Sequence, residues 1–246
     1  MRVASYNIRN ARAIDPTSWW WRRRRRVGDV IADLEADVVC LQEAYPSQIR
    51  YLQRGPLASP EWEFVGRGRN ARGGGEAVPV FAQAARFTLR DGHTQWFGST
   101  PHDPGTHMTG AAHPRISTSA SYDVVGREQA VTIVNLHLDH ASADRRGASV
   151  DQIVSTLPEV RESLVVLGDF NGPLTESWSE ALRGVGFRSV LEDGSGPTAN
   201  GFGDSSGQQQ IDHIFVRDDV TVLDARIVTE AGHASDHYPV VADLEV

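Results

Sequence analysis

Short runs of valine and isoleucine recur along the whole chain of 246 residues, and glycine, proline, aspartate or asparagine bounds them. Runs of four to eight such residues between turn formers are typical of β-strands. A chain with this pattern must fold so that many strands share one core. We predict ten strands, over Val3–Ile8, Val38–Gln42, Glu63–Val65, Val78–Ala82, Ile116–Val125, Val131–Leu138, Leu164–Leu167, Ile211–Val216, Val220–Val228 and Val240–Val246.

Helical periodicity is confined to a few segments between these runs. Apolar residues recur on one face over Arg22–Ala36 and over Ala143–Leu157, as in amphipathic helices. Shorter helices are expected over Gln48–Leu52 and Ser177–Gly184. Because no internal repeat and no proline- or serine-rich linker divides the sequence, we predict an α/β protein with one domain over residues 1–246.

The charged residues exclude several kinds of chemistry. The net charge is −8, and all 24 cationic side chains are arginine. Without lysine the chain can form neither a Schiff base nor a P-loop with its phosphate-binding lysine. The acidic balance argues against a sequence-blind coat for DNA or anionic membrane, since that affinity needs a net positive field.

Cysteine content and hydropathy limit the disulfides, metal sites and membrane segments that the chain can contain. The one cysteine, Cys40, excludes an intramolecular disulfide and a multi-cysteine zinc site. No apolar run reaches the roughly 18 residues of a membrane span, and the sequence opens on a strand pattern rather than a signal peptide. We therefore expect a cytoplasmic protein that has no membrane partner and needs no obligate protein partner.

Three further segments allow two interpretations each. The run Trp19–Arg26 could stack bases and hold phosphates, but five consecutive arginines cover more than one helical turn and cannot all face one ligand; we favour an exposed helix start. The loop Gly66–Gly75 matches the letters of a dinucleotide-binding motif, yet glycines follow where a helix is required. The segment Asp91–Pro114 is expected to be an irregular loop, with histidines that face solvent or substrate rather than a metal.

Polar side chains stand where the predicted strands begin or end. Acids, amides and imidazoles occupy these positions in six separate segments, which turn formation alone does not explain. They are Asn7, Glu43, His137, Asp169 with Asn171, Asp212, and Asp236 with His237. Oxygen donors suit Mg²⁺ or Mn²⁺, and histidine beside an acid suits proton transfer. Because these segments hold no good nucleophile for a covalent intermediate, we predict metal-assisted attack of water on a phosphate ester.

The ordered segments SYNIR, LQE, NLHLDH, LGDFN, QIDHIFV and SDHYPV resemble the endonuclease/exonuclease/phosphatase superfamily. Three further features resemble a group of small bacterial members within it: Gly66–Glu76, Trp96 with the segment Ser99–Gly105, and Arg115. The resemblance runs from Asn7 to the C-terminus. It implies a four-layer α/β sandwich, in which two packed mixed β-sheets are flanked by helices and the site lies at one end.

The resemblance also implies metal ligands. Glu43 matches the principal Mg²⁺ or Mn²⁺ ligand of the family, Asn7 lies beside it as a metal or phosphate contact, and Asp236 matches an acid that assists the metal.

Catalytic roles carry over in the same way. Asp169 resembles the aspartate that orients or activates water, and Asn171 and His137 resemble donors to the scissile phosphate. His237 resembles the catalytic histidine, with Asp212 as the carboxylate that orients it. Whether the aspartate or the histidine takes the proton stays open.

Four arginines are candidates for holding the substrate, because guanidinium grips phosphate oxygens bidentately. They are Arg67, Arg69, Arg72 and Arg115. The charge of −8 favours a small phosphorylated metabolite or a nucleotide over long duplex DNA. The alternatives are a metal-dependent nuclease acting on DNA or RNA and a catalytically silent phosphate-binding module.

Overall fold

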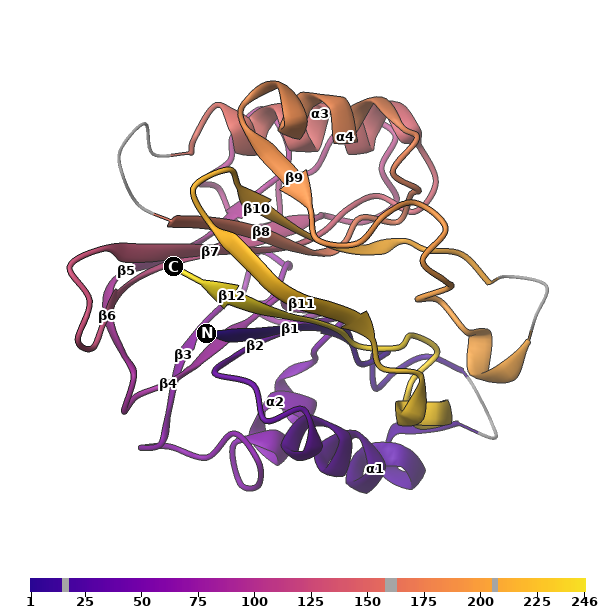
Figure 1. The fold of residues 1–246 in the computed structure, drawn as a ribbon. Coiled ribbons are helices and arrows are strands. Elements are labelled where there is room, and N and C mark those ends of the chain that lie inside the picture. The colour runs from indigo at the N-terminus through magenta and orange to yellow at the C-terminus, as the bar shows by residue number, and fades with distance from the viewer. Residues whose placement is uncertain (15–17, 158–162, 205–207) are drawn as a thin grey trace.

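Two mixed β-sheets of six strands each pack face to face in the computed structural model, which describes residues 1–14, 18–157, 163–204 and 208–246 (Figure 1). In order across the first sheet lie β11 (Thr221–Ile227), β12 (Val240–Glu245), β1 (Arg2–Asn7), β2 (Val38–Gln42), β4 (Val80–Gln83) and β3 (Trp62–Val65). The second sheet holds β5 (Phe87–Trp96), β6 (Ile116–Val124), β7 (Ala130–His137), β8 (Ser163–Asp169), β10 (Asp212–Arg217) and β9 (Phe187–Ser189).

Helices cover both outer faces of the pair of sheets, and so four layers result (Figure 1). The first sheet carries α1 (Trp20–Asp33) and α2 (Pro46–Leu52), and the second carries α3 (Ala143–Val154) and α4 (Ser177–Gly184). Two 3₁₀ turns, η1 (Gly201–Gly203) and η3 (Thr229–Ala234), lie in the connections. The predicted four-layer α/β sandwich is confirmed.

Alternation along each strand sends side chains to two different cores. In β2, Val38 and Cys40 pack between the sheets, whereas Val39 and Leu41 pack against α1 and α2. The strands β7, β8 and β10 repeat the pattern with the helices α3 and α4. Every second residue of such a strand therefore points between the two sheets. At several strand ends the residue in this position is polar.

Two strands were not predicted. Residues 91–96 belong to β5, an edge strand paired with β6, and not to an irregular loop. Its middle is exposed on both faces, so it lacks the apolar alternation that marks a strand. The three residues of β9 pair with the edge of β10 and are too few to show a period. In addition, α1 begins two residues before the predicted start and ends at Asp33.

None of the described helices has the length and apolar character that crossing a bilayer requires.

Candidate active site

Three of the predicted residues form a row across the end of the second sheet. His137 is the register partner of Asp169 in the parallel pair β7–β8, and Asp212 is the partner of Asp169 in the antiparallel pair β10–β8. All three are buried on the inner face. The period-two alternation of valine and leucine thus continues into an imidazole and two carboxylates that face the other sheet.

Asn7 joins this row to the first sheet. Its Nδ2 donates to Asp169 Oδ2 over 2.8 Å and lies 3.4 Å from Glu43 Oε1. Its Oδ1 accepts from the backbone N–H of Arg9 at 2.9 Å, which fixes the orientation of the amide. One fully buried amide therefore lies between a carboxylate of each sheet.

Glu43 and Asn171 both adopt left-handed backbone conformations, with φ of 58° and 53°. Each follows the end of a strand. For residues other than glycine this conformation costs about 1–3 kcal/mol and often accompanies functional sites. It turns both side chains out of strict alternation: Glu43 Oε2 accepts from Asn10 N (2.8 Å) and Nδ2 (2.9 Å), while Asn171 Nδ2 donates to Leu138 O at 3.1 Å.

The Glu43 carboxylate is held ionised. Burial acts to raise its pKa, but the hydrogen bonds from Asn10 and the positive charges of Arg9 and His237 outweigh burial and lower the pKa below its ordinary value. Asn10 was not predicted. The sequence offered one indication of its role, because Asn10 lies three residues after Asn7, which we predicted to belong to the site.

His237 and Asp212 form a buried pair, with Nδ1 of the imidazole 2.7 Å from Asp212 Oδ2. Burial acts to lower the histidine pKa, but the charge and hydrogen bond of Asp212, with the further charges of Asp169 and Asp236, raise it well above the ordinary value. The pair with Asp212 therefore favours the protonated imidazole, in which Nδ1–H is donated to Asp212 and Nε2–H is left for another acceptor.

Asp169 has the opposite electrostatic balance. Burial and the neighbouring charge of Asp212 raise its pKa to about 7, against the lowering effect of His237 and of the donors Asn7 and Asn171. A carboxyl group with this pKa is poised to exchange a proton near neutral pH.

His137 is neutral. Burial and the charge of Arg115 lower its pKa well below the ordinary value. Nη1 of Arg115 donates to His137 Nε2 over 2.7 Å and Nη2 donates to His140 Nδ1 over 2.9 Å. The 3.5 Å approach of His137 Nε2 to Asp169 is therefore not an ion pair, because Nε2 is the acceptor for Arg115.

Two of the four predicted arginines reach the site. Arg69, paired with Glu76, lines a small pocket together with Arg115 and His137. Arg67 is exposed, with its guanidinium carbon 5.7 Å from the centre of the Trp96 ring. Arg72 is exposed as well, and within the described residues neither Arg67 nor Arg72 contacts the row across β7, β8 and β10.

Asp236 faces Arg9, whose Nη1 lies 3.4 Å from Asp236 Oδ2, and Ser235 Oγ donates to Asp236 Oδ1 over 3.2 Å. Burial raises the pKa of Asp236 despite His237 and Arg9. Sequence reasoning missed Arg9, and also Arg146, which donates to Asp139 O over 2.9 Å and thereby supports the loop after β7. Nothing in the sequence pattern distinguished Arg146.

The donors at this end of the sandwich fit a divalent cation. Among the described residues, Asp169, Asp212 and His237 each place a candidate ligand atom within 4.8 Å of one another, and Asp212 Oδ1 is buried without a hydrogen-bond partner. Nδ1 of His237 is already bonded to Asp212, which suits this imidazole to proton transfer, whereas a metal binds neutral imidazole. The oxygens of Glu43 and Asp169, on either side of Asn7, are the hard donors that Mg²⁺ or Mn²⁺ prefers.

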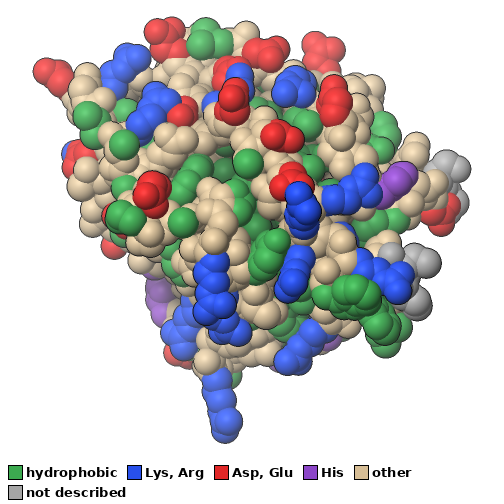
Figure 2. All heavy atoms as spheres, turned by 90° about the horizontal axis from the view of Figure 1, so that it is seen from below, with side chains coloured by type: hydrophobic (Ala, Val, Ile, Leu, Met, Phe, Trp, Pro, Cys, Tyr) green, Lys and Arg blue, Asp and Glu red, His purple; other side chains and the backbone are tan. Residues whose placement is uncertain are grey.

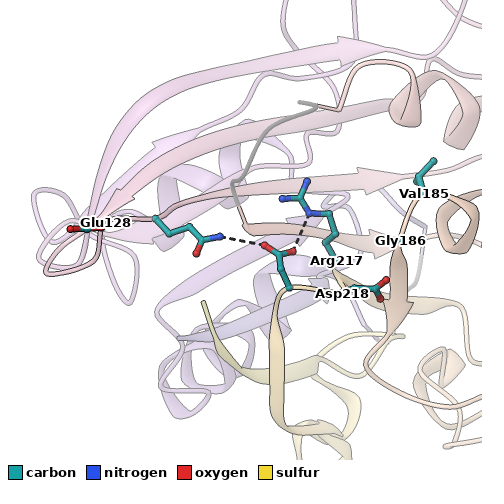
Figure 3. A pocket seen from close by; sticks show the side chains of 7 residues that line it. Glu128, Val185, Gly186, Arg217 and Asp218 are labelled. Carbon is teal, nitrogen blue, oxygen red and sulfur yellow. Dashed lines mark hydrogen bonds and ion pairs between the residues drawn. The ribbon is translucent and has the colours of Figure 1, made fainter.

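A separate hollow lies at the opposite end of the sandwich, beside the β6–β7 turn and the end of β10 (Figure 3). Its walls carry the carboxylates of Glu128, Asp218 and Asp219, and Asp219 is tied to Arg217 at 3.0 Å. An excess of carboxylates repels a phosphate. The site at the ends of β7, β8 and β10 is therefore the better candidate for phosphate chemistry.

Comparison with known proteins matches residues 4–237 to the model of the Endonuclease/Exonuclease/phosphatase family. A search of curated proteins gave no match. Similar solved structures include the endonuclease/exonuclease/phosphatase from Bacteroides vulgatus, with 30% identity, a TM-score of 0.90, and coverage of 100% of this chain and 98% of that one.

Two more distant structures share the fold. The mannosyl-6-phosphatase Bt3783 of Bacteroides thetaiotaomicron VPI-5482 has 24% identity and a TM-score of 0.89, with both chains covered completely. The human Nocturnin catalytic domain with bound sulfate has 17% identity and a TM-score of 0.76 over 100% of this chain and 94% of that one. From the match along nearly its whole length, the chain belongs to the endonuclease/exonuclease/phosphatase family, whose members are hydrolases acting on phosphate esters.

Proposed function

We propose that the protein is a Mg²⁺- or Mn²⁺-dependent phosphoesterase that hydrolyses a small phosphorylated metabolite or a nucleotide. The observation that carries the proposal is the convergence of Asn7, Glu43, Asp169 and the His237–Asp212 pair at one end of the sandwich. The set combines hard oxygen donors, a carboxyl group poised near neutral pH and a protonated imidazole, which are the parts that hydrolysis of a phosphate ester requires.

Each residue has a role in a one-step displacement. Asp169 orients the attacking water and accepts its proton as the water oxygen bonds to phosphorus and the ester P–O bond breaks in line. Asp212 holds Nδ1 of His237, so that Nε2–H points to the phosphate or the departing oxygen. The neutral His137 and Asn171 flank the same space. A divalent ion held by the carboxylates of Glu43 and Asp169, which Asn7 positions through its Nδ2, would neutralise charge on the phosphoryl oxygens.

The guanidinium groups favour a substrate of limited size. Arg69 and Arg115 line one small pocket beside His137, which suits the oxygens of one phosphate group. The net charge of −8 opposes long-range attraction of a polyanion. A small ester is therefore a better substrate than long duplex DNA.

The test is a panel of phosphate esters, including p-nitrophenyl phosphate, sugar phosphates and nucleotides, beside single- and double-stranded DNA and RNA. We expect release of phosphate from small esters that stops with EDTA, returns with Mg²⁺ or Mn²⁺, and is lost in Glu43→Gln. Efficient nuclease turnover at physiological salt without monoester hydrolysis would contradict the substrate. Turnover that is insensitive to EDTA would contradict the mechanism.

A further inference from the structure

An aromatic surface without a role in the proposed mechanism lies at the start of α1. Seven large apolar residues of the described surface are exposed, and three of them gather here: Ile14 (88% exposed), Trp21 (57%) and Trp19 (44%). Figure 2 shows arginine and apolar side chains together on the face that α1 and α2 form. A clustered set of exposed apolar side chains commonly marks a binding surface.

These side chains line a hollow that we name the aromatic groove, formed by residues 11–14, residues 19–21 and Ser47. Contacts with the rest of the protein fix the wall that α1 contributes. Trp20 packs edge-on against Tyr51, with ring centres 5.8 Å apart. Arg23 is buried below Trp20, and its guanidinium group donates to the backbone oxygens of Ile8 and Arg9 at 2.5 Å. Trp19 and Trp21 are thus held beside the loop that follows β1 while their indoles stay open to a ligand.

The aromatic groove and the candidate active site share the loop that follows β1. Ala11, at one edge of the groove, follows directly after Asn10, which donates two hydrogen bonds to Glu43. Adjacent Cα atoms are about 3.8 Å apart. Arg12 lies with its guanidinium carbon 5.2 Å from the centre of the ring of Tyr45, two residues beyond Glu43. The loop that follows β1 therefore contributes both to the surroundings of Glu43 and to the lining of the groove.

The described part of the lining suits a flat aromatic group. Among the described residues of the groove, the polar side chains are Arg12 and Ser47, with no carboxylate or amide to accept hydrogen bonds from several hydroxyls. Indole faces and guanidinium planes instead stack on nucleobases, largely irrespective of which base it is. Arg22 repeats the arrangement beside the groove, 4.9 Å from the ring centre of Trp21.

We propose that the aromatic groove binds the base of a nucleotide substrate, with Trp19 and Trp21 as the stacking surfaces. The inference rests on the proposed function, because it places the scissile phosphate at Glu43 and the base in the groove. Of the two small substrates proposed above, it selects the nucleotide.

The test compares adenosine 5′-monophosphate with ribose 5-phosphate, which share the phosphorylated ribose and differ at C1′, where the first carries adenine and the second a hydroxyl group. We expect a higher kcat/KM for the nucleotide. In the double variant Trp19→Ala/Trp21→Ala that value should fall about 5- to 150-fold, the range found when stacking aromatics are replaced by alanine, while ribose 5-phosphate turnover stays unchanged. Val125→Ala, which truncates another exposed apolar side chain at the distant β6–β7 turn, should change neither.

Binding supplies a readout that does not need turnover. Adenosine 5′-monophosphate should quench tryptophan fluorescence in the wild-type protein and far less in the double variant, and ribose 5-phosphate should quench neither. Equal loss of turnover for both esters, or an unchanged nucleotide response in the double variant, would overturn the inference. Hydrolysis of p-nitrophenyl phosphate that depends on Glu43 and the metal, without preference for the nucleotide, would overturn the inference and leave the proposed function standing. Failure to hydrolyse every ester would overturn the proposed function itself.

Discussion

The two halves of the candidate site are tied together by a buried amide pair, and its removal should weaken both fold and activity. Gln42, next to Glu43, donates from Nε2 to Asn135 Oδ1 over 2.7 Å, and Asn135 is two residues from His137. Asn135 Nδ2 donates over 2.9 Å to the backbone oxygens of Leu41 and Pro79. Both side chains are fully buried between the sheets, so these bonds join β7 to β2 and to the segment before β4.

The number of lost hydrogen bonds gives the expected size of the stability loss. Asn135→Ala removes three buried hydrogen bonds, each of which contributes about 1 kcal/mol net, and leaves Gln42 Nε2 only its longer contacts to Ser5 and Cys40. We expect the free energy of unfolding to fall by about 3 kcal/mol or somewhat more. Because the pair positions the segments that carry Glu43 and His137, kcat for p-nitrophenyl phosphate should fall about 10- to 100-fold.

Equilibrium urea unfolding followed by tryptophan fluorescence measures the stability term. Gln208→Ala, which changes an exposed amide, serves as the control and should stay within about 0.5 kcal/mol of wild type. A double-mutant cycle with Gln42→Ala should give a coupling energy of about 1 kcal/mol or more. Loss of less than 1 kcal/mol in Asn135→Ala, or additive effects in the cycle, would refute the role assigned to the pair.

Three further predictions concern the metal, the backbone and pH. Mg²⁺ should raise the urea midpoint of the wild-type protein but not that of Glu43→Gln, and an equal rise in both would show that the ion binds elsewhere. Gly168→Ala should lose more than about 3 kcal/mol of stability, because φ is +142° and a Cβ would lie 2.1 Å from Leu136 O; Gly184→Ala, with no atom within 4 Å of its Cβ, should be neutral or stabilising in thermal or urea unfolding. The raised pKa of His237 gives stability that is fully present below pH 6.5 and is lost as pH rises through the folded-state pKa. Asp212→Asn should therefore lower the urea midpoint at pH 6, and above neutral pH its midpoint should fall less steeply with pH than that of the wild-type protein. Equal slopes in the two proteins would contradict the His237–Asp212 ion pair.

The strands and the residues at their ends could be predicted because period-two alternation and burial leave a local signature. Asp169 and Asp212 directly adjoin inner apolar rows, Asn7 and His137 continue the inner rows of β1 and β7 beyond Ser5 and Asn135, and the structure brings the four together. Their roles stay predictions. The edge strand β5 could not be found, since a strand exposed on both faces has no apolar pattern.

Contacts between distant segments were beyond sequence reasoning for a different reason. Asn10 meets Glu43 from 33 residues away and Arg146 meets Glu176 from 30. These contacts depend on where loops pass over the sheet ends, and no spacing rule relates such loops. Likewise, Arg23 is buried and Trp19 and Trp21 are exposed. In a run of five arginines, the sequence does not indicate which one turns inward.

The pairing of β1 with both β2 and β12 has a consequence for the order of assembly. Arg2 is the register partner of Asp243, and His237 lies just before β12. During synthesis, a chain emerging from the ribosome can form the β5–β6–β7 meander early, yet β1 keeps an open edge and Asp212 keeps no imidazole partner until residues 237–245 have been added. In a translation reaction, phosphoesterase activity should therefore appear late and abruptly, once β12 has paired with β1 in the first sheet.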